Sequence, residues 1–203
     1  MKMRKISAVS ATLAAMLLLS ACAGISAPSR FYTLSSLAEV PSPTVSGTAS
    51  EISVSIARVT FPEWLDRTQI VTRSSRNQIA VAEFERWAGS LADDFTKVLG
   101  ENLAVLLRTT RIDTQPSERR FDVDYQLHID VLHFEGSLTE EVSLKARWIV
   151  TSGVDRDVVG IHTIAIDEPV DAPDYESLVR AKSSALLALS EEIALRLQEV
   201  AAR

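Results

Sequence analysis

Alternating apolar and polar positions predict three consecutive strands in the second half of the chain. The clearest alternation runs over residues 122–134, and it recurs over 141–151 and 158–167. Each stretch has the pattern of a strand with one buried face. Because the links are short and one of them holds Ser152-Gly153, we predict an antiparallel meander. The buried face of the first strand should carry Val123, Tyr125, Leu127, Ile129 and Val131.

Shorter strand patterns occupy the first half of the chain. Residues 51–60 alternate cleanly, and the strand should end before Pro62, because proline lacks the N–H that a strand ladder needs. Two further strands are predicted over 69–73 and 78–82, on either side of a polar turn. Residues 31–34 form a short aromatic run that favours β structure.

Two other stretches change to the three- and four-residue spacing of an amphipathic helix. The first covers residues 89–107, with Ser90 as its N-cap and two aspartates near its positive end. The second begins at Pro173-Asp174 and continues towards the C-terminus. Their apolar stripes are Leu91, Phe95, Val98, Leu99, Leu103 and Leu106 in the first helix, and Tyr175, Leu178, Val179, Leu186, Leu189, Ile193, Leu197 and Val200 in the second.

The order of these elements predicts the fold class. Each helix has one apolar face to cover, and a sheet with one apolar face can cover both helices. We therefore predict a two-layer α+β domain over residues 31–203, with two long helices packed on one face of a mostly antiparallel sheet. No internal repeat and no second domain are indicated.

The N-terminal segment has the pattern of a secretion signal. Three cations precede an apolar run over residues 6–19, which is shorter than the roughly 20 residues that span a bilayer. The sequence Leu19-Ser20-Ala21-Cys22 resembles the lipobox of bacterial lipoproteins, which implies cleavage before Cys22 and covalent lipid on its sulfur and new amine. We expect a signal peptide at 1–21 and a lipidated tether at 22–30, reaching at most about 30 Å. An ordinary secreted protein with a chance cysteine is the alternative.

Charge and cysteine usage narrow the classes of function. Without the signal, the chain keeps 18 basic and 27 acidic residues, a formal charge of −9. Such a charge disfavours binding to nucleic acid and electrostatic docking on anionic lipid. The covalent lipid must therefore hold the chain at the membrane. Acylation of Cys22, the only cysteine, leaves no disulfide. Apart from that lipid, we expect no cofactor.

Catalytic chemistry has little support in the sequence. The motifs G-x-S-x-G, H-E-x-x-H, G-x-G-x-x-G and the Walker loop are absent. His128 and His133 lie five residues apart on one predicted strand, so they should point to opposite faces unless the strand is bulged. His128 shares a polar face with Asp130, which leaves a metal or acid–base site as the alternative to a solvated strand face. His162 is expected to be structural or exposed. We expect neither catalysis nor a metal site.

Two segments carry aromatic residues that the predicted α+β fold does not by itself require. The connection after the 51–60 strand places Trp64 and Leu65 beside charged residues, and aromatic side chains on loops often contact partners. The hypothesis is a partner interface at this turn; the alternative is that Trp64 folds back over the edge of the sheet. Trp87 precedes the first helix and should fix its start to the core. The interface residues are Pro62, Trp64, Leu65, Asp66 and Arg67.

Several short motifs follow the lipobox in a fixed order along the chain. They are Phe31-Tyr32-Thr33-Leu34, Pro62-x-x-Leu65-Asp66-Arg67 leading into Ile70-Val71-x-Arg73, Phe84-x-x-Trp87-Ala88 before Leu91, and Phe134-Glu135-Gly136 near a strand end. This ordered set resembles the ABC-type transport auxiliary lipoproteins of the PqiC/YmbA kind over nearly all of the mature chain. Gly89-Ser90 departs from the family pattern, which often has an acidic or small residue followed by proline. Ser90 can cap the helix instead.

The resemblance implies a non-catalytic auxiliary component of an ABC/MCE-type lipid transport system that maintains the envelope. It implies a lipid anchor at the periplasmic face of the outer membrane, with an MCE-domain bridging protein and inner-membrane transporter components as partners. Ala23 after the cysteine fits outer-membrane delivery. A ring-like homo-oligomer is our further expectation, because one small domain offers little surface for gripping a bridge. An outer-membrane assembly chaperone and a periplasmic hydrolase stay open as alternatives.

Overall fold

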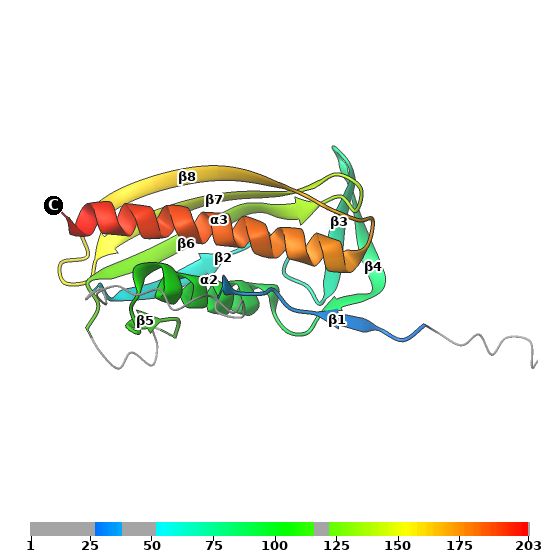
Figure 1. Cartoon of the computed structure of the whole chain (residues 1–203). Coiled ribbons are helices and arrows are strands. Elements are labelled where there is room, and N and C mark those ends of the chain that lie inside the picture. Colours follow the sequence, from blue (N-terminus) through cyan, green and yellow to red (C-terminus); the bar gives the residue numbers. More distant parts are fainter. Residues whose placement is uncertain (1–26, 38–51, 116–121, 203) are drawn as a thin grey trace, which may run out of the picture.

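The computed structural model describes residues 27–37, 52–115 and 122–202. The signal segment and Cys22 lie outside these described residues. Figure 1 shows a curved sheet with helices along one face and a smaller group of strands at one end. The elements are β1 (Arg30–Tyr32), β2 (Val54–Thr60), β3 (Gln69–Ser75), β4 (Gln78–Trp87), α2 (Leu91–Leu107), β5 (Ile112–Asp113), β6 (Tyr125–Gly136), β7 (Glu141–Ser152), β8 (Val158–Pro169) and α3 (Tyr175–Ala201).

The predicted meander is confirmed. Strands β6, β7 and β8 pair antiparallel, with Leu127 opposite Val150 and Val150 opposite Gly160. The turn between β7 and β8 begins at Gly153, whose N–H donates to the carbonyl of Asp124 at 2.8 Å. A Cβ atom at Gly153 would lie 1.7 Å from the carbonyl oxygen of Val123, so this close approach of two backbones requires glycine.

Strand β2 lies between β5 and β6 in a five-stranded sheet of order β5-β2-β6-β7-β8, and it is parallel to both neighbours. Its polar side is buried as well as its apolar side. Ser53 and Ser55 are buried because their hydroxyls have partners: Ser53 Oγ donates to the Asp124 carboxylate at 2.6 Å, and Ser55 Oγ to the Asp113 carboxylate at 3.4 Å. The prediction of a half-buried strand therefore underestimated its burial.

A second sheet replaces the single sheet that the sequence suggests. Its order is β1-β4-β3, with β1 parallel to β4 and β3 antiparallel to β4. The β3–β4 hairpin confirms the strands predicted on either side of a polar turn. The α+β class and the two helices are confirmed, but the strands divide into two sheets and several pairs are parallel. Alternation of side chains specifies a buried face and gives no pairing direction, which explains the difference.

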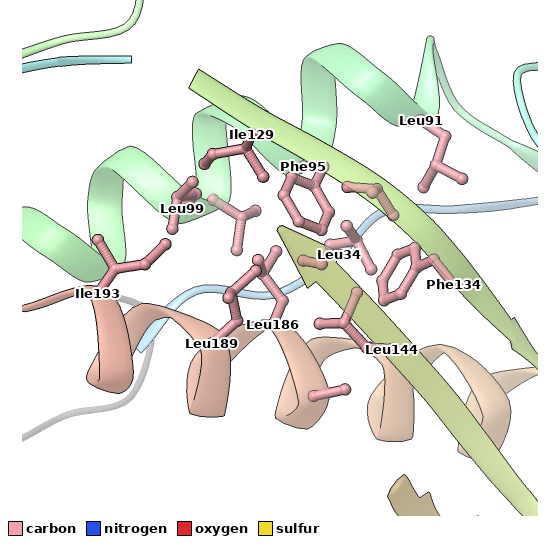
Figure 2. Packing of buried hydrophobic residues seen from close by; sticks show 14 of the residues in the cluster. Leu34, Leu91, Phe95, Leu99, Ile129, Phe134, Leu144, Leu186, Leu189 and Ile193 are labelled. Carbon is pink, nitrogen blue, oxygen red and sulfur yellow. The ribbon is translucent and has the colours of Figure 1, made fainter. Parts of the chain in front are cut away.

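The core lies between the helices and the large sheet. Figure 2 shows apolar side chains of α2, α3, β6 and β7 pointing towards one another, with Leu34 among them. The predicted N-cap Ser90 is confirmed, because its side chain accepts from the N–H of Asp93. Asp174, where the second helix was expected to begin, caps α3 by accepting from the N–H of Ser177. Trp87 is buried in the core at the start of α2, as predicted. The helices therefore cover one face of the large sheet.

Candidate partner-binding surface

The turn after β2 is closed by its own backbone and fixed by the partly buried Phe61 and the buried Leu65. The carbonyl of Pro62 accepts from the N–H groups of Leu65 at 2.9 Å and Asp66 at 3.3 Å. On one side of the turn, the ring of Phe61 packs edge-on against Phe95, with 5.2 Å between centroids. On the other side, Leu65 is only 2% exposed. The backbone of this turn is thus held rigidly against the core.

The structure separates two residues that the interface hypothesis grouped together. Leu65 is a core residue and offers no apolar surface to a partner, which corrects that part of the hypothesis. The reason is the closed turn, which points Leu65 inwards. Trp64 is half-buried, packing partly against the core. Asp66 and Arg67 are exposed and Pro62 is half-buried, so only part of the predicted set remains accessible.

The guanidinium of Arg73 in β3 lies against the ring of Trp64. Its guanidinium carbon lies 5.9 Å from the centre of the Trp64 ring, within the range of a cation–π contact. Its Nη2 donates to Glu135 Oε1 at 2.6 Å, and its Nη1 donates to the carbonyl of Arg76 at 2.9 Å. A side chain held at both ends of its guanidinium keeps a fixed position under the tryptophan.

The β3–β4 hairpin extends the apolar area beside Trp64. Arg73 is the register partner of Ile79, and Val71 is the partner of Val81. Directly opposed residues of an antiparallel pair project from the same face. Ile79 and Val81 are both exposed, Val81 to 44% of its surface. We call Trp64, Ile79 and Val81, with Arg73 between them, the hairpin surface.

Glu135 links the hairpin surface to the interior. Its carboxylate is 3% exposed. It accepts hydrogen bonds from Arg73 and, at 2.9 Å, from the Phe134 N–H, and it lies 3.1 Å from His133 Nδ1. Burial alone would raise the pKa of the Glu135 carboxyl, but the donors from Arg73, His133 and Phe134 outweigh it and hold the pKa below its usual value. The carboxylate is therefore charged at neutral pH and fixes β3 to β6.

Lys182 lies on the inner side of the same cluster. It is fully buried in α3, its Nζ donates to the Phe134 carbonyl, and Nζ is 4.3 Å from the centre of the Phe134 ring. Burial lowers the pKa of the Lys182 ammonium to about 7, and the Glu135 carboxylate opposes part of that shift. Lys182 is not among the residues that the sequence predictions single out. The signal was present, because Lys182 falls between Leu178 and Leu186 in the apolar stripe of α3.

The histidine and aspartate of the catalytic alternative do not form an acid–base pair. Asp130 accepts from Arg147 Nη2 at 2.7 Å and from Thr60 Oγ1 at 2.8 Å, and these donors, Arg147 first, lower its pKa. A bulge in β6 between Val131 and His133 adds one residue, so His128 and His133 share the outer face. This corrects the expectation of opposite faces.

The outer face still lacks a metal-binding cluster. Among the described residues, no group of three or more His, Cys, Asp or Glu side chains is placed to hold a metal ion. His162 is structural, with its ring stacked on Trp148 at 5.2 Å between centroids. No helix in the described part of the chain is long and apolar enough to cross a membrane.

The two-layer fold and a rigid apolar surface beside the hairpin define a small α+β domain suited to protein contacts. The chain belongs to the ABC-type transport auxiliary lipoprotein family, whose model matches residues 32–194. This confirms the resemblance that the ordered motifs gave. A search of curated proteins found no match.

Two solved structures share the fold. An uncharacterized protein is 17% identical with a TM-score of 0.68, over 84% of this chain and 99% of its own. Protein XCC0632 from Xanthomonas campestris is 16% identical with a TM-score of 0.65, over 85% of this chain and 97% of its own. At these identities the likeness concerns the fold alone.

Proposed function

We propose that this chain is a non-catalytic lipoprotein, anchored through Cys22 at the periplasmic face of the outer membrane, that assists an ABC/MCE-type lipid transport system. Membership of the ABC-type transport auxiliary family over residues 32–194 is the observation that carries this proposal. The ion-paired state of Asp130 adds support, because a carboxylate held by Arg147 is a poor general base at the only site that suggested catalysis.

The hairpin surface is the proposed contact for the MCE-domain bridging protein. It combines a half-buried tryptophan, two exposed aliphatic side chains and an arginine, which is the composition of binding hot spots. Its backbone is fixed by the closed turn and by the Arg73–Glu135 pair. A rigid surface loses little conformational entropy on binding, so this arrangement favours tight contact.

A ring of several copies is the second part of the proposal. A ring needs two unlike faces on each copy. The hairpin surface lies at one end of the molecule, and the turn between β7 and β8 lies at the other (Figure 1). Strand β8 is an edge strand, and with this turn it exposes Val154, Val158 and Ile161. These two ends supply the unlike faces that head-to-tail contact requires.

Site-specific photo-crosslinking tests the proposal and separates it from the chaperone alternative. A photoreactive amino acid replaces Ile79 in the hairpin surface and, as the matched control, Leu132 on the outer face of β6, which is similarly exposed. The proposal predicts that position 79, and not position 132, captures an MCE-domain protein in intact cells. Capture of newly made outer-membrane proteins at position 79 would assign the chain to assembly instead.

A further inference from the structure

The domain begins with an exposed aromatic residue beside an arginine whose Nε has no acceptor among the described residues. Phe31 of β1 is 65% exposed. In the parallel pair of β1 and β4, Phe31 is the register partner of Arg86. Residues paired in this way project from the same face of the sheet. The first strand of the domain therefore presents a phenyl ring and a guanidinium next to each other.

Arg86 lacks the acceptors that its neighbour has. The guanidinium of Arg30, one position earlier in the ladder, donates to the Glu85 carboxylate with a shortest distance of 2.6 Å. Arg86 is half-buried and its Nε is buried, yet no described residue accepts a hydrogen bond from it. A buried guanidinium nitrogen without an acceptor is unfavourable. The accessible part of the group stays available to an oxyanion, because guanidinium matches phosphate in charge and geometry.

The position of this pair along the chain indicates what supplies the oxyanion. Phe31 follows Cys22 by nine residues, so the two are separated by at most about 30 Å of extended chain. Figure 1 shows the chain leaving β1 at the end of the molecule that carries the β3–β4 hairpin. A bilayer that holds lipidated Cys22 therefore lies within reach of Phe31 and Arg86.

We propose that Phe31 and Arg86 form a docking site for the phospholipid surface to which the chain is anchored. The Phe31 ring enters the boundary between headgroups and acyl chains, and Arg86 binds a lipid phosphate. The inference rests on the lipid anchor of the proposed function. The mature charge of −9 gives no long-range attraction to an anionic membrane, but the anchor supplies a high local lipid concentration that makes two short-range contacts sufficient. The contact fixes the orientation of the domain, and so the position of the hairpin surface.

A fluorescent reporter on the lipidated full chain tests the docking site. Cys22 is the only cysteine, so Thr33→Cys provides the one free thiol once Cys22 carries lipid. Thr33 is exposed and lies two residues from Phe31, which stays intact. The labelled chain is placed on phospholipid vesicles that carry a nitroxide quencher near the headgroup. We expect strong quenching at position 33 and little at Val154→Cys, an exposed site in the turn between β7 and β8.

Variants on the Thr33→Cys background separate the two contacts. Phe31→Ser and Arg86→Gln should each reduce quenching by about half, whereas Arg58→Gln, at an exposed arginine of β2, should leave it unchanged. On vesicles of an uncharged glycolipid, which has no phosphate, Arg86→Gln should have no effect and Phe31→Ser should still reduce quenching. Equal quenching in all variants on phospholipid would overturn the inference.

The experiment distinguishes a wrong proposal for the lipid anchor from a wrong proposal for the docking site. A chain that floats with the vesicles but shows no quenching at position 33 overturns the docking site and leaves the anchor intact. A chain without an introduced cysteine that takes up the label at Cys22 overturns the anchor, and the docking site with it.

Discussion

Arg73 on β3 donates to Glu135 on β6 with 2.6 Å between Nη2 and Oε1, and this pair joins the two sheets of the domain. The Trp64 ring lies against the same guanidinium, and the Lys182 ammonium donates to the carbonyl of Phe134, the residue before Glu135. The exposed surface and the buried lysine are thus connected through one carboxylate. The shape of the hairpin surface depends on that carboxylate being charged.

Replacing the Glu135 carboxylate by an amide tests this dependence. Glu135→Gln keeps the shape but removes the charge that Arg73 and Lys182 face, so we expect a loss of about 1–3 kcal/mol in the free energy of unfolding at pH 7. Because the folded pKa of Glu135 is below its unfolded value of about 4.3, its stabilisation is present above that pH and is lost as the pH falls through the folded pKa.

Urea unfolding at neutral pH and near pH 4 measures the effect. The difference between parent and Glu135→Gln should shrink on acidification. Glu63→Gln, in the exposed part of the turn, serves as the control and should change little. An equal difference at both pH values would show that the carboxylate charge is not what stabilises the junction.

Lys182 should also make stability rise with pH, but in the neutral to alkaline range. Its folded pKa of about 7 is below its unfolded value of about 10.4, so the unfolded chain binds more protons between these values and stability rises with pH there. Between pH 7 and pH 9 this lysine should add about 2 kcal/mol to the free energy of unfolding. Lys182→Met should remove that rise, as measured by urea unfolding across the range. The same slope in parent and variant would contradict a buried, titrating lysine.

The sequence predicts those elements whose signals are local. The meander, the Ser90 cap, the start of the last helix at Asp174 and the burial of Trp87 follow from alternation, capping chemistry and apolar spacing, and the structure confirms each. The parallel placement of β2 beside β6 could not be predicted, because side-chain alternation is the same for both pairing directions.

Part of the candidate surface was predictable and part was not. Trp64 stood out because an aromatic residue in a turn is unusual. The inward direction of Leu65 and the pairing of Arg73 with Ile79 depend on turn closure and strand register, which are tertiary features. The bulge that brings His133 to the face of His128 is also a tertiary feature, since no glycine or proline marks it.

His128 and Asp130, on the outer face of β6, should be dispensable for function in cells. His128→Ala combined with Asp130→Ala removes the Arg147 ion pair, which is largely exposed, so stability should change by about 1 kcal/mol or less. Growth of cells under envelope stress should match the parent. Loss of function with an unchanged melting temperature would revive the hydrolase alternative.

Lipid attachment at Cys22 remains a prediction, because that residue lies outside the described part of the chain. Cys22→Ser should abolish incorporation of radiolabelled palmitate and release the protein from membranes or block its processing. The parent should be recovered with outer-membrane fractions, since Ala23 follows the cysteine. Equal labelling of parent and Cys22→Ser, or an inner-membrane location of the parent, would refute the corresponding part of the account.

Binding of an MCE-domain protein from the same cell tests the central claim most directly. If Trp64 anchors the hairpin surface, Trp64→Ala should weaken binding about 30-fold, or about 2 kcal/mol, with only a small drop in melting temperature. Leu65→Ala is the adjacent control: it should cost about 2–5 kcal/mol of stability, because Leu65 is buried. Unchanged affinity of Trp64→Ala together with a large drop in its melting temperature would assign Trp64 to the core and contradict the account.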